Sequence, residues 1–161
     1  MKLVETSIAG AWVIESKAFQ DKRGAFSRLF CMHELQAILG SRTIAQINHS
    51  MTHSVGAVRG LHYQNAPHAE MKIVRCLKGR VFDVAADLRQ GSPTFLKWTA
   101  VELTPENNLA FVIPEGCAHG FQVLEPVEMI EIKQGPYSGE NDKTRFAEAP
   151  ASVKRIKGAT S

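Results

Sequence analysis

The sequence predicts an all-β protein, a sandwich or small barrel, with one short helix. Three observations predict this class: many short apolar and β-branched runs, turn residues that close each run, and alternation of polar and apolar residues within runs. With 161 residues, of which 44% are hydrophobic and 22% charged, the chain fits one globular domain with a core. We therefore predict a single domain over 1–161, with a polar, lightly packed tail from about residue 150.

Nine runs are predicted as strands. In chain order they are Ala11–Glu15, Thr43–Ile47, Val58–Tyr63, Lys72–Leu77, Val81–Ala86, Phe95–Leu103, Leu109–Ile113, Gly120–Leu124 and Val127–Ile132. The separators are rich in Gly, Pro and Asn, and they are Lys78-Gly79, Gln90–Pro93, Thr104–Asn108, Pro114–Gly116 and Glu125-Pro126. Between Val81 and Asp87 the acids Asp83 and Asp87 punctuate apolar residues, which supports a strand there.

One helix is predicted over residues 32–40. Met32–Leu39 contains good helix formers and places Leu35, Ile38 and Leu39 on one face. Gly40 follows as a suitable C-terminal cap.

Composition and charge exclude several classes of function. The formal net charge is only +3, which does not indicate a nucleic-acid partner, although an anionic ligand such as a diphosphate fits. No run is long and apolar enough for a membrane span, and we expect no signal peptide at the N-terminus. Cys31, Cys76 and Cys117 are odd in number and far apart, which predicts reduced thiols and a cytoplasmic location.

Two stretches carry residues suited to chemistry. In Arg59–Gln64, strand alternation puts His62 and Gln64 on one face, and Lys72 opens the next predicted strand. Pro114–Phe121 is a tight turn that leads into a strand at His119. A single strand histidine is usually a hydrogen-bonded structural residue. Two of them, together with Arg59 and Lys72 in a small barrel, favour a ligand site.

The chain resembles the dTDP-4-dehydrorhamnose 3,5-epimerase family from about residue 20 to Lys133. The blocks that carry the resemblance are Asp21–Phe26, Gln46–Ser50, Val58–Gln64, Lys72–Arg75, Gly79–Arg89, Ser92–Phe95, Asn107, Ile113–Gly116 and Ala118–Phe121. The motif Arg59–Gln64 would be only suggestive alone. Its place among ordered blocks makes the resemblance specific.

The resemblance implies a homodimeric double-stranded β-helix, a cupin or jelly-roll-like barrel, that uses no metal or other cofactor. It implies an isomerase of deoxysugar biosynthesis acting on a nucleoside-diphosphate 4-keto-6-deoxy sugar, and no membrane or nucleic-acid partner. A base removes a proton beside the ketone, an enolate forms, and a proton returns to the opposite face. By position, His62 matches the base and Lys72 matches the group that stabilises the enolate. The residues that match substrate-binding positions are Arg23, Phe26, Gln46, Asn48, Arg59 and His119.

The chain departs from the family pattern at its proton donor. Counting from His119 without gaps, Ile132 stands where the family has a catalytic tyrosine before a lysine. Tyr137 is the nearest replacement, although it also fits a second family tyrosine that stacks on the nucleobase. The resemblance with this gap implies epimerisation at both carbons, at one carbon only, or of a different sugar.

Three further departures concern two charged positions and the length of the C-terminal part. Arg28 stands where the family usually has a glutamate, and Glu70 stands where it usually has a glutamine, close enough in sequence to pair with Lys72. The C-terminal part is shorter than in the family, so Asp142 is the candidate carboxylate for orienting His62. Asp83 is a second candidate.

Two other functions remain open at this stage. A metal-dependent cupin enzyme could use His62, His68, Glu70 and His119, although the H-x-H motif of such enzymes is missing. A non-catalytic sugar-nucleotide binding module would explain Ile132.

Overall fold

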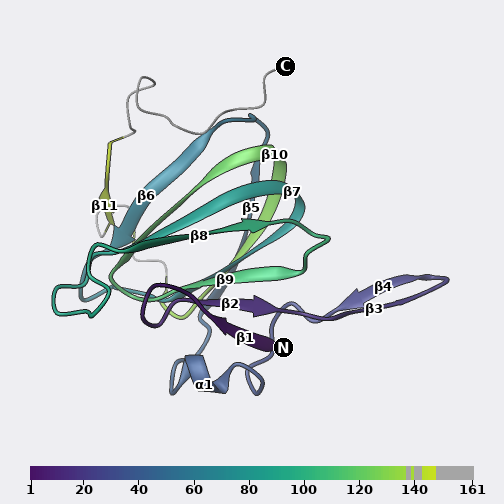
Figure 1. Ribbon diagram of the computed structural model, residues 1–161, viewed down its shortest axis with the longest axis horizontal. Helices are drawn as coiled ribbons and strands as arrows, with labels where there is room; N and C mark the ends of the chain where they lie inside the picture. The colour runs from purple at the N-terminus through teal and green to yellow at the C-terminus, as the bar shows by residue number, and fades with distance from the viewer. Residues whose placement is uncertain (137–138, 140–142, 148–161) are drawn as a thin grey trace.

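The computed structural model describes residues 1–136, 139 and 143–147 and is almost entirely β structure (Figure 1). Its elements are β1 (Lys2–Glu5), β2 (Trp12–Glu15), β3 (Ala18–Asp21), β4 (Gly24–Ser27), α1 (Gln36–Leu39), β5 (Gln46–Thr52), β6 (Val58–Gln64), β7 (Lys72–Asp87), β8 (Trp98–Leu103), β9 (Leu109–Ile113), β10 (Cys117–Lys133) and β11 (Lys143–Arg145). The predicted all-β class is confirmed. No helix of the described residues is long and apolar enough to cross a membrane.

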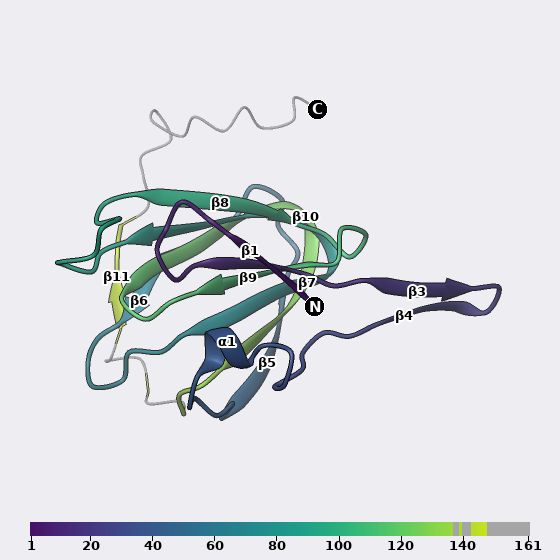
Figure 2. The same ribbon diagram turned by 60° about the horizontal axis from the view of Figure 1, so that its bottom comes forward.

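Two long antiparallel strands, β7 and β10, organise the barrel. They pair from Lys72 opposite Lys133 to Asp87 opposite Cys117, with register shifts near the middle. The first half of β7 also pairs with β9, and the second half pairs with β8. On its other edge, β10 pairs with β6 and then with β5, and β11 extends the sheet beyond β6. One sheet therefore folds over into two facing layers (Figures 1 and 2).

The fold-over occurs where the sequence places Lys78-Gly79 and Glu125-Pro126. We expected these pairs to separate strands, but each lies inside one long bent strand. Gly79 has a φ of +76°, and a Cβ there would lie 2.0 Å from the carbonyl oxygen of Pro126. Glycine is required because the two bends pass each other in backbone contact.

Two hydrophobic clusters fix the layers. The first lies between them and includes Val74, Val81, Phe111, Val123 and Met129. The second lies on the outer face of the layer that contains β9, and the segment with α1 covers it through Leu35 and Leu39. Strand alternation sends β7 residues to both sides, because Val74 faces the first cluster and Ile73 the second. The space left between the layers is where a ligand can enter.

Several element boundaries differ from the sequence expectation. The helix is one turn, Gln36–Leu39, because Met32–Leu35 form turns before it. The strand expected at Thr43–Ile47 begins at Gln46, where pairing with β10 starts. We did not predict β1, β3, β4 and β11, which are only three or four residues long and carry little periodic signal.

The β3–β4 hairpin forms a separate two-stranded sheet that projects from the barrel (Figure 2). Phe19 and Phe26 pair across it and are 63% and 66% exposed. Neither phenylalanine belongs to the two hydrophobic clusters of the barrel.

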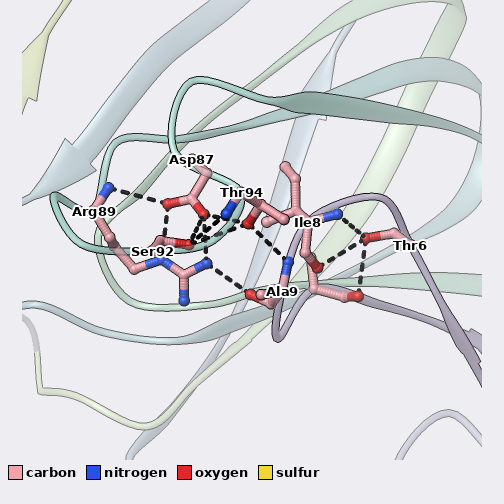
Figure 3. A network of polar contacts seen from close by, with 8 residues as sticks. Thr6, Ile8, Ala9, Asp87, Arg89, Ser92 and Thr94 are labelled. Carbon is pink, nitrogen blue, oxygen red and sulfur yellow. Dashed lines mark hydrogen bonds and ion pairs between the residues drawn. The ribbon is translucent and has the colours of Figure 1, made fainter.

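A polar network joins the N-terminal loop to the loop between β7 and β8 (Figure 3). Asp87 is fully buried and accepts hydrogen bonds from Arg89, Ser92 and Thr94. Arg89 also donates to the carbonyl oxygen of Ala9, and the amide of Ala9 donates to Thr94. This network fixes one end of the barrel.

Candidate active site

A cavity of about 420 Å³ opens between strands of the two layers. Its walls come from β5, β6, β10 and β11, and its lining residues are Ser50, Val58, Arg59, Gly60, His62, Phe121, Glu131 and Arg145. It is the right size for a small-molecule ligand. Its walls are rich in polar and charged side chains, which suits an anionic, hydroxylated molecule.

His62 and His119 are neighbours on the paired strands β6 and β10. They lie opposite each other in the β6–β10 ladder, and their ring centroids are 6.0 Å apart in an edge-on arrangement. On the other side of β6, Arg145 lies opposite His62. The close approach of β6 and β10 depends on Gly60 and Gly120, because a Cβ on Gly60 would lie 2.6 Å from the Cα of Gly120.

Asp83 supports His119 and not His62. Its Oδ1 lies 2.6 Å from Nε2 of His119, and both side chains are almost completely buried. Burial raises the pKa of Asp83, and His119 partly opposes that rise. Asp83 was our second candidate for orienting His62, but in the structure its carboxylate contacts His119 instead. Asp83 faces inward with Val81 and Ala85, whereas Phe82 and Val84 face outward.

The electrostatic surroundings keep the imidazole of His62 neutral. Burial lowers the pKa of His62 to about 3, and the positive charge of Lys72 and the nearby His119 add to the effect. A neutral imidazole is the form that can accept a proton.

Lys72 is buried at the start of β7, with only 4% of its surface exposed. Burial lowers the pKa of its ammonium, while Glu131 and Glu70 oppose the change. Glu70, which we expected to pair with Lys72, instead lies 2.9 Å from the Nζ of Lys133. Lys133 takes this place because it lies directly opposite Lys72 in the β7–β10 ladder.

Glu131 is a site residue that the sequence prediction missed. It lines the cavity with His62, and its Oε2 lies 3.5 Å from the Nζ of Lys133. Burial would raise the pKa of Glu131, but Lys133, Lys72 and His119 together lower it. A signal was present, because alternation in Ile130–Lys133 puts Glu131 and Lys133 on one face and both isoleucines on the other.

Ile132 does not face the cavity. It is 2% exposed and packs with Ile73, Leu35 and Leu39 in the outer hydrophobic cluster. Ile132, which the ungapped count from His119 places at the family's tyrosine, is therefore a core residue. Its neighbour Glu131 faces the cavity.

Gln46 and Asn48 lie on one face of β5 together with Ser50, which lines the cavity. The amide of Asn48 donates to the side-chain oxygen of Gln46, and Gln46 donates to the carbonyl oxygen of Gly135. Asn48 is also paired with Glu131 across the β5–β10 ladder. These contacts hold both amides on the face of β5 that carries Ser50, and their role in substrate binding stays a prediction.

Arg23 and Phe26 lie elsewhere, on the projecting hairpin. Of the residues that the structure describes, neither lines the cavity that contains His62. Arg23 is paired with Asp21 at 2.6 Å on the exposed turn. Arg28 contacts Glu34, which also contacts the N-terminal amine. Tyr137 and Asp142 fall outside the described residues.

The alternative set of metal ligands is not assembled. His68 is exposed in the turn after β6, and Glu70 is engaged by Lys133. Within 1–136, 139 and 143–147, no three His, Cys, Asp or Glu side chains are grouped to hold a metal ion.

Comparison with known proteins shows to which family the chain belongs. The sequence model of the family described as dTDP-4-dehydrorhamnose 3,5-epimerase matches residues 5–152. The chain belongs to the dTDP-4-dehydrorhamnose 3,5-epimerase family. It is 46% identical over 125 residues to dTDP-4-dehydrorhamnose 3,5-epimerase of Shigella flexneri, covering 77% of this chain and 68% of that protein.

Solved structures of the epimerase family have the same fold. The crystal structure of dTDP-4-dehydrorhamnose 3,5-epimerase from Bacillus anthracis with TDP and PPi bound has a TM-score of 0.88 at 30% identity, covering 99% of this chain and 91% of that chain. ChmJ, a 3'-monoepimerase from Streptomyces bikiniensis in complex with dTDP-quinovose, has a TM-score of 0.79 at 30% identity, covering 87% and 71%. The predicted cupin-type fold and epimerase family are confirmed, and neither alternative function is favoured.

Proposed function

We propose that this protein epimerises a nucleoside-diphosphate 4-keto-6-deoxy sugar at a carbon atom adjacent to the ketone, with His62 as the base. The observation that supports this is a neutral, half-buried imidazole facing a polar cavity beside a buried lysine. The family relationship gives the substrate class.

The chemistry needs a base and a cation. The ketone acidifies the protons on its neighbouring carbons, and His62 takes one of them to leave an enolate. The negative oxygen then lies near the ammonium of Lys72, and such stabilisation is typically worth about 10²–10³-fold in rate. The developing negative charge also raises the basicity of His62, so the proton transfer becomes favourable as the enolate forms.

Substrate binding is assigned to the cavity walls. Arg59 lines the cavity and its Nη1 lies 3.1 Å from Oγ1 of Thr52, so the guanidinium is held at the rim where its planar fork fits diphosphate oxygens. Gln46, Asn48 and His119 supply groups for the sugar. Arg23 and Phe26 are proposed to bind the nucleotide from a second copy of the chain.

That last assignment rests on a homodimer. The hairpin holds Arg23 and Phe26 away from the cavity of its own chain and exposes two phenylalanines. In a dimer the same hairpin can bury its aromatic side chains and complete the partner's site.

Inversion at a single carbon is the narrower activity that the site favours. Ile132 is packed in the outer cluster, and the described lining of the cavity contains no tyrosine. The proton that completes the reaction then comes from solvent or from Tyr137, which lies outside the described residues.

A reducing, cytoplasmic location fits the thiols. Cys31, Cys76 and Cys117 are all unpaired, and burial raises the pKa of the Cys76 and Cys117 thiols to about 11. Such thiols are inert small hydrophobic residues.

Proton NMR in deuterated water tests the proposed activity. With dTDP-4-keto-6-deoxyglucose, we expect deuterium to enter beside the ketone, and the number of exchanging positions gives the number of carbons inverted. His62→Ala should abolish exchange and keep nucleotide-sugar binding. Native-rate exchange in that variant would show that His62 is not the base. Binding without exchange in the unmodified protein would favour a different sugar or a non-catalytic site.

A further inference from the structure

Among residues 1–136, 139 and 143–147, no carboxylate pairs directly with the buried ammonium of Lys72. Only 4% of the residue is exposed. A buried amine in this position tends to lose its proton, because burial disfavours the charged form. A neutral amine would not stabilise an enolate.

Titratable groups from several elements surround Lys72. Lys133 and Glu131 come from β10, Glu70 from the segment before β7, Asp83 from β7 itself, His62 from β6 and Lys143 from β11. Three of these are carboxylates that could balance the ammonium. They differ in how far each is already committed to another partner.

Two of the three carboxylates are held by other residues. Glu70 contacts the Nζ of Lys133 at 2.9 Å, and Asp83 lies 2.6 Å from His119. Glu131 is held more loosely, at 3.5 Å from Lys133, and it faces the cavity. In the β7–β10 ladder Glu131 lies opposite Val74, two residues along β7 from Lys72, so Glu131 and Lys72 are diagonal neighbours on the same face.

We propose that Glu131 is a positioning residue that keeps Lys72 protonated for its role beside the enolate. The catalytic part of this inference rests on the proposed function, whereas the electrostatic coupling of the two residues does not. Lys133 acts in the opposite sense, because its own positive charge repels that of Lys72 and it draws on the same two carboxylates. The residue that sets the charge of Lys72 is thus Glu131, the direct neighbour of Ile132, which stands at the tyrosine position of the family.

Competitive acylation tests the coupling without any substrate. The folded protein is labelled with trace acetic anhydride between pH 6 and pH 10, and the modification of Lys72 is followed by mass spectrometry. In Glu131→Gln, we expect Lys72 to be acylated roughly threefold to tenfold faster at pH 8, because loss of the carboxylate favours the free amine. Glu128→Gln is the matched control, since Glu128 lies on the same strand beside Lys78 and His49.

Two further variants test in which direction each neighbouring charge changes the acylation rate of Lys72. Lys133→Met should slow acylation of Lys72, because it removes a repelling charge and frees Glu131. Glu131→Asp, which keeps the charge, should stay close to the unmodified protein. If Glu131→Gln is folded and leaves the labelling of Lys72 unchanged, or if Lys133→Met speeds it, the inference is wrong. If Glu131→Gln does not fold, the result for Lys133→Met decides.

Activity separates the inference from the proposed function. If both hold, Glu131→Gln should lose deuterium exchange at a lower pH on the alkaline side, with KM changed less than kcat. A shift in labelling with no exchange in the unmodified protein would support the coupling and contradict the proposed function. A shift in labelling with an unchanged alkaline limb would overturn the catalytic role given to the Glu131–Lys72 pair.

Discussion

At the scale of single residues, the site depends on how burial and neighbouring charges set proton occupancy. His62 and Lys72 are both pushed toward their neutral forms by burial. That change suits a base but not an enolate-stabilising cation. The carboxylate of Glu131, itself kept ionised by nearby lysines, lies where it restores the charge of Lys72. One acid in the cavity wall therefore lets two residues with opposite requirements share a buried site.

The protonation of His62 gives a direct prediction. Because its pKa is lowered to about 3, the imidazole should remain neutral at pH 5. Nitrogen-15 NMR of the side chain, assigned with His62→Asn, measures this. The lowered pKa also means that the unfolded chain binds this proton more strongly, so His62 reduces stability as pH falls from about 6.5 toward 3. A His62 signal that becomes protonated near pH 6.5 would contradict the description of the site.

At the scale of elements, the site is set by where strands touch. β6 and β10 approach so closely at Gly60 and Gly120 that no side chain fits between them. This contact brings His62 and His119 to the same level of the barrel. The bend in the long strand β7 then brings Lys72, at its start, and Asp83, in its second half, to one interior.

Gly60→Ala should separate β6 from β10. Its new Cβ would lie 2.6 Å from the carbonyl oxygen of His119, and the backbone φ of +116° suits only glycine. We expect a loss of about 1–3 kcal/mol in unfolding free energy, with a larger proportional loss of exchange activity. Urea unfolding and the deuterium assay measure the two effects. Gly91→Ala is the matched control, because it also has positive φ but open space around it.

The network around Asp87 supports the C-terminal end of β7, the strand that begins with Lys72. Burial would raise the pKa of Asp87, but hydrogen bonds from Arg89, Ser92 and Thr94 lower it overall. Asp87→Asn should therefore cost about 3 kcal/mol of unfolding free energy at pH 7. The cost should shrink as pH falls below about 4, where the unfolded carboxyl takes up its proton. Thermal unfolding at pH 7 and pH 3.5 tests both statements, and an equal cost at the two values would contradict the ionic explanation.

At the scale of the whole molecule, the β3–β4 hairpin forms an arm that projects from the barrel of the single chain. The β3–β4 hairpin holds Phe19 and Phe26 in solvent and carries Arg23 at its turn. The barrel contains the base and the lysine, whereas the arm contains residues that the family resemblance assigns to substrate. The homodimer that we propose would bring the two parts together, with the hairpin of one copy at the cavity of the other.

Replacement of both hairpin phenylalanines by serine should weaken the proposed dimer. We expect the double variant Phe19→Ser, Phe26→Ser to shift toward monomer by light scattering at micromolar concentration, with reduced nucleotide-sugar binding. Leu96→Ser, which removes another exposed apolar side chain away from the hairpin, serves as the control. If the unmodified protein is monomeric, or if the double variant dimerises normally, the arm has another role.

The sequence by itself determined the class of fold and the family, and it supplied the candidates for the site. Short alternating runs predict strands because side-chain direction has a period of two, and ordered motifs identified His62, Lys72, Arg59 and His119. Tertiary structure decided which charges meet. The partner of Asp83, the pairing of Glu70 with Lys133, and the choice of Glu131 over Ile132 as the residue facing the cavity all depend on register and bends. Coulomb interactions act over a few ångströms in space, and a one-residue change in register reverses the face of every side chain in a strand.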